Sequence, residues 1–228
     1  MKIIDNVFVV PEVAANTYII VDADGLTLID AGLPRSQRKI LDFVAGLGKS
    51  AHDIKRILIT HADWDHIGGL AALHRATGAR TYAGKIEAEA MAAGRPSRST
   101  RLPPSTPLIR RLMRHFMKPR PFRVEEILTD GQILQEVLGG LRVIDTAGHS
   151  PGHISLFAPS RGILFCGDSM VTDENGIHGS RPIFTWDEAM AKEAVRRQAA
   201  LGARIVCSGH GPVIMDAAGK FPVEDDAS

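Results

Sequence analysis

The chain has few cysteines, and this scarcity limits the chemistry that they can support. Only Cys166 and Cys207 occur in 228 residues, which is too few for a disulfide framework and lacks the paired spacing of a zinc knuckle. Both lie in apolar segments, where cysteine usually serves as a small buried side chain. The scarcity is compatible with a cytoplasmic protein, which is the location that we expect.

Long apolar runs, a charge excess and aromatic residues are also scarce. No apolar run approaches the ~20 residues of a membrane-spanning helix, and the first ten residues contain Asp5 and lack the apolar core of a signal peptide. The formal net charge is +1, so no overall field selects a nucleic acid or a membrane. Aromatic residues make up 5% of the chain and are not interleaved with the basic ones. We therefore expect a small-molecule substrate, no nucleic-acid partner and no membrane span.

The spacing of the apolar residues predicts strands, helices, strands and a last helix. The predicted helices cover 34–47, 67–77, 85–93 and 186–201. Strands are predicted at 7–10, 18–21, 26–30, 57–59, 80–83, 127–128, 133–134, 141–144, 154–157, 163–166 and 204–207. Two such halves suit two sheets packed together with helices outside, an α/β sandwich. The length suits a single domain over 1–228 with one insertion.

The insertion is a predicted cap at about 94–123, a stretch without acidic residues. Inside it the pattern predicts an amphipathic helix, with an apolar face of Ile109, Leu112, Met113, Phe116 and Met117 and basic residues Arg110, Arg111, Arg114 and Lys118 off that face. Three roles are open: a lid over the active site, attraction of an anionic substrate, or contact with a membrane surface or partner.

Four segments place a His or Asp where an apolar strand is predicted to end, namely ILITHADWDH, RVIDTAGHSPGH, ILFCGDSM and RIVCSGHGP. Ligand sites in α/β folds gather beyond strand ends. The first segment alone has four potential ligands in six residues, and such groups are costly to bury unless something pairs with them. The candidate metal ligands are His61, Asp63, Asp65, His66, His149, Asp168 and His210. Such a set suits a pair of divalent cations better than one tetrahedral zinc ion.

The first segment also has an alternative interpretation as the polar start of a helix. In that case Asp63 or Asp65 would cap the helix that follows. If the residues instead bind metal, 61, 63 and 65 point the same way only in an extended chain, and His66 turns back as the helix begins. The His and Asp residues at the later strand ends favour the metal site.

The four motifs, in this order, resemble the metallo-β-lactamase superfamily. They are Thr-His-x-x-x-Asp-His-x-Gly-Gly, Gly-His-Ser-Pro-Gly-His, Gly-Asp and Gly-His-Gly, and the similarity extends from Asn16-Thr17-Tyr18 to His210. The resemblance implies a four-layer αβ/βα sandwich of two mixed sheets with outer helices. It also implies a metal-dependent hydrolase.

The resemblance further implies a role for each matching residue. His61 and His149 look like ligands of a first metal ion, and Asp65, His66 and His210 look like ligands of a second. Asp168 resembles the carboxylate that bridges both ions. Asp30 is similar to the buried aspartate that orients ligands, and His153 to a residue that supports the turn.

One residue departs from the family pattern, His-x-His-x-Asp-His, because Asp63 stands where the second His is expected. A carboxylate is a harder ligand than imidazole and moves the metal preference toward iron or manganese. An acidic residue here resembles iron-binding members such as flavodiiron proteins, which carry Glu and perform redox chemistry. Two zinc ions remain the first expectation, with iron or manganese as alternatives.

The expected reaction is hydrolysis of a small ester, lactone or thioester by a metal-bridging hydroxide. Asp65 is a candidate for handling the proton. His178, in a predicted loop soon after Asp168, is a second catalytic candidate if it reaches the open side of the metals, or an exposed loop residue if it does not. The alternatives are an iron-dependent oxidoreductase of the same fold and a non-catalytic binding protein.

Overall fold

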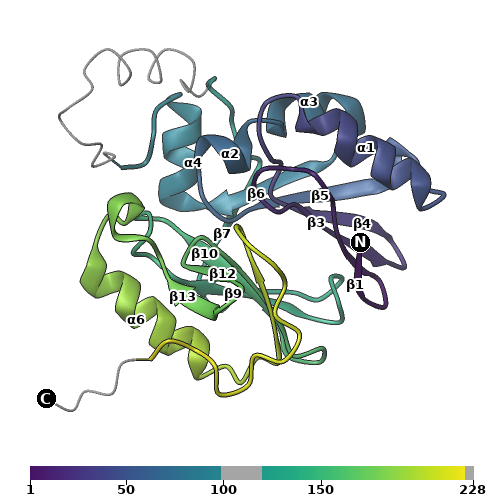
Figure 1. The fold of residues 1–228 in the computed structure, drawn as a ribbon. Helices are drawn as coiled ribbons and strands as arrows, with labels where there is room; N and C mark the ends of the chain where they lie inside the picture. Colours follow the sequence, from purple (N-terminus) through teal and green to yellow (C-terminus); the bar gives the residue numbers. More distant parts are fainter. Residues whose placement is uncertain (99–119, 224–228) are drawn as a thin grey trace, which may run out of the picture.

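Two mixed β-sheets stack against each other in the computed structural model, which describes residues 1–98 and 120–223 (Figure 1). The first sheet has the order β1 (Lys2–Ile4), β2 (Val7–Val9), β3 (Tyr18–Asp22), β4 (Gly25–Ile29), β5 (Ile54–Ile59), β6 (Arg80–Gly84) and β7 (Glu126–Leu128). The second has the order β14 (Ile205–Ser208), β11 (Ile163–Gly167), β10 (Ile154–Ala158), β9 (Leu141–Asp145) and β8 (Ile133–Leu134).

Strand direction changes within each sheet. Strands β1 to β4 form an antiparallel meander, and β4 to β7 run parallel to one another. In the second sheet β8 to β11 are antiparallel, whereas β11 and β14 are parallel. The central strands are apolar on both faces, because one face meets the other sheet and the opposite face meets helices.

The core between the sheets joins residues from both halves of the chain. Ile20 and Leu58 of the first sheet belong to the same buried cluster as Val143 and Leu156 of the second. The ring of Tyr18 meets a phenylalanine ring of β11 edge to face, with the centroids 5.3 Å apart. Burial of this apolar surface is the main force that holds the two sheets together.

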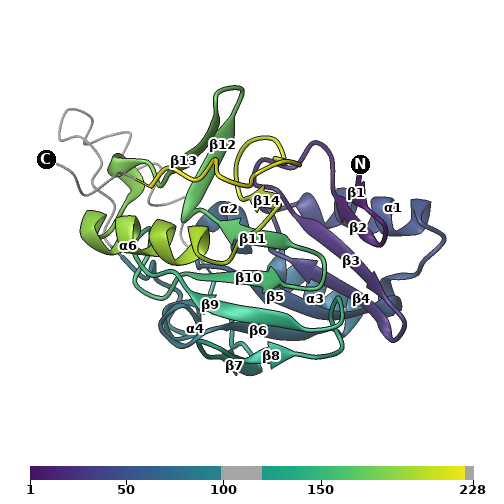
Figure 2. The ribbon, with the colours of Figure 1, turned by 90° about the horizontal axis from the view of Figure 1, so that it is seen from below.

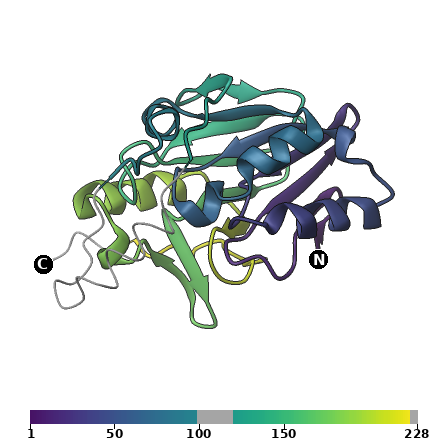
Figure 3. The same ribbon diagram turned by 90° about the horizontal axis from the view of Figure 1, so that it is seen from above.

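Helices cover the two outer faces. Helices α1 (Ser36–Gly46), α2 (Trp64–Ile67), α3 (Leu70–Thr77) and α4 (Lys85–Ala92) lie on the first sheet (Figure 3). Helix α6 (Glu188–Ala199) lies across the second sheet (Figure 2), and two short 3₁₀ helices, η1 (Ala51–Asp53) and η2 (Pro182–Phe184), complete the described elements. The predicted four-layer sandwich with outer helices is therefore confirmed.

Two local predictions are wrong. The helix predicted over 67–77 starts three residues later, as α3 at Leu70, because Ile67 is the last residue of α2 and Gly68 and Gly69 separate the two helices. A Cβ at Gly68 would lie 2.3 Å from the Pro34 ring, and one at Gly69 would lie 2.3 Å from the Ala31 carbonyl oxygen, so backbone packing dictates the break. The predicted loop around 173–179 is mostly a hairpin of β12 (Met170–Asp173) and β13 (Gly176–Gly179), which projects from the body in Figure 2.

The predicted basic helix over 109–118 lies outside the described residues, so its three possible roles and the limits of the cap stay predictions, as does the single-domain organisation. Among the helices that the structure describes, none is long and apolar enough to cross a membrane.

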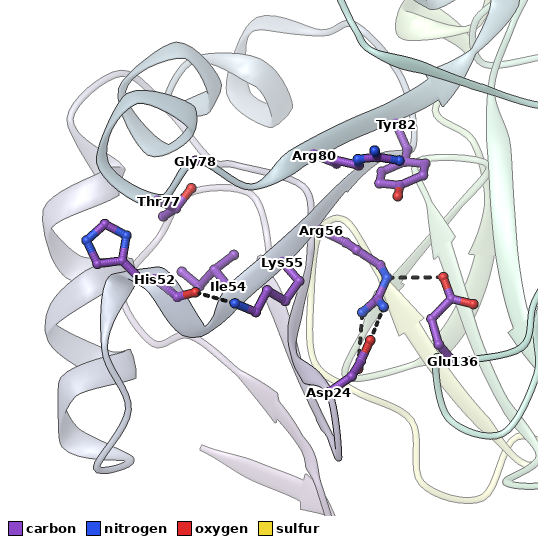
Figure 4. Close-up of a pocket in the computed structure, with 10 residues that line it drawn as sticks. All are labelled: Asp24, His52, Ile54, Lys55, Arg56, Thr77, Gly78, Arg80, Tyr82 and Glu136. Atoms are coloured by element: carbon purple, nitrogen blue, oxygen red, sulfur yellow. Dashed lines mark hydrogen bonds and ion pairs between the residues drawn. The ribbon is translucent and has the colours of Figure 1, made fainter.

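A cavity of about 520 Å³ lies at the amino-terminal ends of β5 and β6 (Figure 4). One of the residues that line it, the buried Arg56, forms ion pairs with Asp24 and Glu136. Glu136 Oε1 accepts a hydrogen bond from Arg56 Nε at 3.1 Å. Glu136 belongs to the loop between β8 and β9, so this charge group ties the two sheets together at this end. The predicted metal ligands follow the opposite, carboxyl-terminal strand ends.

Candidate metal centre

The carboxyl-terminal ends of five strands, β4, β5, β9, β11 and β14, meet at one place between the sheets. The structure brings all seven predicted ligands together there, in three overlapping groups: His61, His66 and Asp168; His61, Asp63 and His149; and Asp65, His66 and His210. Within each group the potential ligand atoms lie within 4.8 Å of one another. The convergence of segments 149 positions apart in sequence is what the strand-end pattern predicted.

Asp168 lies at the middle of the centre, between the groups. Its Oδ1 is 3.3 Å from His66 Nε2, and its Oδ2 is 3.3 Å from His210 Nε2 and 3.8 Å from His149 Nε2. Burial by itself would raise the pKa of Asp168, but His66 and His210 hold that pKa well below its ordinary value. Asp168 is therefore a carboxylate at neutral pH, and its two oxygens face histidines of all three groups.

Asp30 orients His66 by contacting its Nδ1, the ring nitrogen opposite the one that faces the centre. Its backbone has φ +62°, in the left-handed region that aspartate tolerates better than most residues. This turn at the end of β4 directs Oδ2 to His66 Nδ1 at 2.8 Å, while Oδ1 accepts from the Thr60 amide at 2.9 Å. Since Nδ1 faces a carboxylate, it keeps its proton when His66 is neutral, and Nε2 is then the nitrogen that can bind a cation at the centre.

The loop after β5 is partly helical. Asp63 occupies the N-cap position of α2, but its side chain makes no capping hydrogen bond. Asp65 lies in the first turn of α2 and directs Oδ2 to His210 Nε2 at 3.2 Å. The extended alternation expected for 61, 63 and 65 is therefore wrong, because the helix begins at Trp64, yet all three side chains still reach the centre.

Glu87 is a functional residue that the motifs did not reveal. It lies in the first turn of α4 and is completely buried. Its Oε2 accepts from the Ala62 amide at 2.9 Å, and its Oε1 accepts from the Ser150 hydroxyl at 2.7 Å and the Gly152 amide at 3.0 Å. One carboxylate thus joins the loop that carries His61 to the loop that carries His149.

Two more side chains set the orientation of the histidines. Ser180 Oγ lies 2.9 Å from His149 Nδ1, which leaves His149 Nε2 for the centre. His153 is fully buried, and its Nε2 accepts from the Asp168 amide at 3.0 Å. Because this nitrogen accepts, the proton of His153 is on Nδ1, 2.8 Å from a threonine hydroxyl. His153 therefore supports the turn at Asp168, as the resemblance implied.

The Asn16-Thr17-Tyr18 motif holds the loop that carries His210. The Asn16 side-chain amide donates to the carbonyl oxygens of Ser208 and Gly211, at 2.9 and 2.8 Å, and the Tyr18 hydroxyl donates to that of Ser208 at 2.6 Å. Within this loop a Cβ at Gly209 would lie 2.1 Å from Asp168 Oδ1, so the close approach of backbone to carboxylate requires glycine.

His178 lies on β13, and its side chain is 43% exposed. Its Nε2 is 2.8 Å from Asp173 Oδ1 on the adjoining strand of the same hairpin. It belongs to none of the three groups of potential ligands that the described residues form. A catalytic role for His178 stays a prediction, and no contact described here supports it.

The donor set fits a divalent metal ion. His61 Nε2, His66 Nε2 and Asp168 Oδ1 are buried and have no hydrogen-bond partner among the residues that the structure describes. Buried polar atoms are normally satisfied, and three that converge without a hydrogen bond suit the coordination of a cation. Imidazole nitrogens and carboxylate oxygens are the ligands that zinc, iron and manganese share.

An α/β sandwich of two mixed sheets with such a His and Asp cluster at its strand ends defines a class of metal-dependent hydrolases. The chain belongs to the metallo-beta-lactamase superfamily, since the sequence model of that family matches residues 10–210. The superfamily, the fold class and the enzyme class predicted from the motifs are thereby confirmed.

Individual relatives agree with this assignment. The protein named "Probable metallo-hydrolase YflN" of Bacillus subtilis (strain 168) is 27% identical over 86% of this chain and 80% of its own length. The hydroxyacylglutathione hydrolase of Rhodobacter capsulatus is 32% identical over 69% of this chain, which spans 48% of that relative. A metallo-beta-lactamase of Cronobacter sakazakii with an HARLDQ motif is 25% identical and has a TM-score of 0.70, covering 92% of this chain and 76% of that chain.

Proposed function

We propose that the protein is a hydrolase that cleaves a small ester, lactone or thioester with a bound divalent cation, zinc first and iron or manganese next. The observation that carries this proposal is the convergence of His61, His66 and Asp168, whose inward atoms have no hydrogen-bond partner in the described part of the chain. When bound, the cation lowers the pKa of a water molecule and polarises the scissile carbonyl group. The candidate ligands are the members of the three groups, namely His61, His66, His149, His210 and the three aspartates.

The open side of the centre is at Asp65 and His210. Their side chains are 32% and 31% exposed, whereas those of His61 and His66 are completely buried. Burial raises the pKa of Asp65, but the hydrogen bond with His210 outweighs it and lowers that pKa below its ordinary value. Asp65 is thus an ionised carboxylate on the accessible side, able to accept a proton from an attacking water and return it to the leaving group.

Among the three substrate classes, we place thioesters first. The support is the hydroxyacylglutathione hydrolase relative, whose name describes an enzyme that acts on an acylated thiol. Fold alone does not choose a substrate, so this preference rests on similarity. A screen of lactone, thioester and phosphodiester substrates will rank the classes, and preferential cleavage of phosphodiesters would contradict the proposal.

Removal of the metal is expected to abolish hydrolysis. Dialysis against a chelator should reduce turnover of the best substrate by about a thousandfold or more, because the cation supplies several kcal/mol of transition-state stabilisation. Addition of Zn²⁺ should restore it, and circular dichroism should show that the stripped protein stays folded. Full activity of metal-free protein would contradict the proposed hydrolase. Iron in protein purified without added metal, with oxygen-dependent turnover, would favour the oxidoreductase alternative.

Metal affinity is expected to keep rising as the pH increases beyond the ordinary pKa of a histidine side chain. Hydrogen bonds to Asp168 and Asp65 raise the pKa of His210 to about 9 in the metal-free protein. A cation at Nε2 must displace that proton, so affinity should increase by up to about tenfold per pH unit until pH 9, rather than level off near 6.5. Zn²⁺ titration calorimetry in buffers of different ionisation enthalpy would count the protons released. The exposed His52→Gln variant is the control, and an affinity that is constant above pH 7 would refute this expectation.

A further inference from the structure

The guanidinium of Arg98 lies inside the group of ligands expected for the first metal ion. Nη1 donates to Asp63 Oδ1 at 2.5 Å and Nη2 to Asp63 Oδ2 at 2.7 Å, a two-pronged ion pair. Nη2 also lies 2.9 Å from His149 Nε2. The side chain is 2% exposed, so this cation is buried with its partners.

Arg98 is held there from a second direction. Its Nε and Nη2 lie 3.2 and 3.0 Å from the carbonyl oxygen of Phe184, the last residue of η2. A guanidinium has five N–H donors in a rigid plane and no acceptor. Fixed by a carboxylate on one side and a carbonyl on the other, the plane has one orientation, which directs Nη2 at His149.

This arrangement uses the same lone pairs that a first metal ion would need. Nη2 has two N–H bonds and three neighbouring acceptors, namely Asp63 Oδ2, His149 Nε2 and the Phe184 carbonyl oxygen, which share its donation. Because arginine stays protonated in proteins, His149 Nε2 can only be an acceptor in this contact. Both oxygens of Asp63 are engaged as well. The other ligands differ, because none of the contacts described for them is with Arg98. His66 Nε2 lies 3.3 Å from Asp168 Oδ1, and His210 contacts Asp65 and Asp168.

Charge leads to the same conclusion. Asp63, Asp65 and Asp168 bring three carboxylates to the centre. Arg98 and one divalent cation supply three positive charges. Asp63 is also the residue that departs from the His of the family pattern, so the departure and the arginine meet in one ion pair. A buried carboxylate without such a partner would be costly.

We propose that Arg98 occupies the first of the two cation positions, so that the centre takes up one divalent ion per chain, at His66, Asp168 and their neighbours Asp65 and His210. This inference rests on the proposed metal dependence. It replaces the two ions implied by the family resemblance with one ion and a guanidinium. His61, which like His66 belongs to two of the groups, is available to the remaining ion through Nε2.

The test is a count of bound metal. Stripped protein is titrated with Co²⁺, followed by its visible absorption, and the metal retained after desalting is measured by mass spectrometry. The wild type and Arg95→Ala, a matched charge loss at an exposed arginine three residues earlier, should saturate at one equivalent. Arg98→Ala should saturate at two, because Asp63 and His149 are then free to bind.

The number of metal ions bound tests the role of Arg98 separately from the proposed metal-dependent hydrolase. Two equivalents in the wild type, or one in folded Arg98→Ala, would overturn the role of Arg98 and leave the proposed hydrolase intact. No tight binding in any variant would overturn the proposed hydrolase itself. Should Arg98→Ala not fold, the wild-type count still decides, and the paired variant Asp63→His with Arg98→Ala, which restores the family pattern, should bind two.

Discussion

Replacing Asp168 by asparagine is expected to lower kcat/KM by about a thousandfold or more, the equivalent of ~4 kcal/mol in transition-state stabilisation. Asp168 lies 3.3 to 3.8 Å from His66, His149 and His210, so it is next to at least one ligand of each of the three groups. Asparagine keeps the shape but removes the negative charge, and one of its two terminal positions becomes an N–H donor that cannot bind a cation. Metal affinity should fall with activity.

Asp216→Asn is the matched control, because Asp216 is exposed and pairs only with Lys220 among the contacts that the structure describes. Steady-state kinetics, metal content and thermal unfolding should be measured on all three proteins. Asp168→Asn should unfold cooperatively, since the backbone amide of residue 168 still donates to His153. An Asp168→Asn enzyme with wild-type turnover and metal content would show that the centre described here is not the active site.

The sequence predicted the ligand set because every ligand follows a strand with a strong apolar pattern. His61 follows β5, Asp168 follows β11 and His210 follows β14. Parallel or neighbouring strands bring such ends to one edge, so the positions were predictable without any knowledge of side-chain contacts. The hairpin of β12 and β13 was missed because its two strands are only four residues long and follow the ligand loop directly.

Arg98, Glu87 and Ser180 could not be predicted in the same way. Each acts through long-range contacts with the ligand loops and follows no strand-end motif. Arg98 lies 35 residues from Asp63 in sequence, and Glu87 lies 65 residues from Gly152. Asp63 was the one signal available, because a carboxylate in place of an imidazole requires a compensating cation. By itself Asp63 indicated a harder metal ion such as iron or manganese, whereas in the structure it forms an ion pair with Arg98.

Loss of the Glu87 carboxylate is expected to destabilise the fold and weaken the metal centre together. Glu87 accepts three hydrogen bonds in a site without water contact, two on one oxygen and one on the other. An unsatisfied buried donor costs about 1–3 kcal/mol. Glu87→Ala leaves three such donors and a cavity, so we expect a loss of roughly 4 kcal/mol or more from an unfolding free energy of about 5–15 kcal/mol.

Glu87→Gln separates positioning from stability. The amide keeps one acceptor oxygen and turns an N–H₂ group toward a donor, so either Ala62 or the Ser150 and Gly152 pair loses its partner. We expect a smaller loss of about 2 kcal/mol, which leaves the protein folded. Metal affinity should still fall about 10–100-fold, because the loops that carry His61 and His149 are no longer fixed relative to each other.

The control is Glu89→Gln, on the exposed face of the same helix two residues later. Chemical denaturation of metal-free protein gives the stability change, and Zn²⁺ titration gives the affinity. Addition of Ser150→Ala to Glu87→Gln should cost less than Ser150→Ala in the wild type, since the two side chains share one hydrogen bond. If Glu87→Gln binds Zn²⁺ with wild-type affinity, Glu87 stabilises the fold but does not position the ligands, and the link between the two loops has no functional consequence.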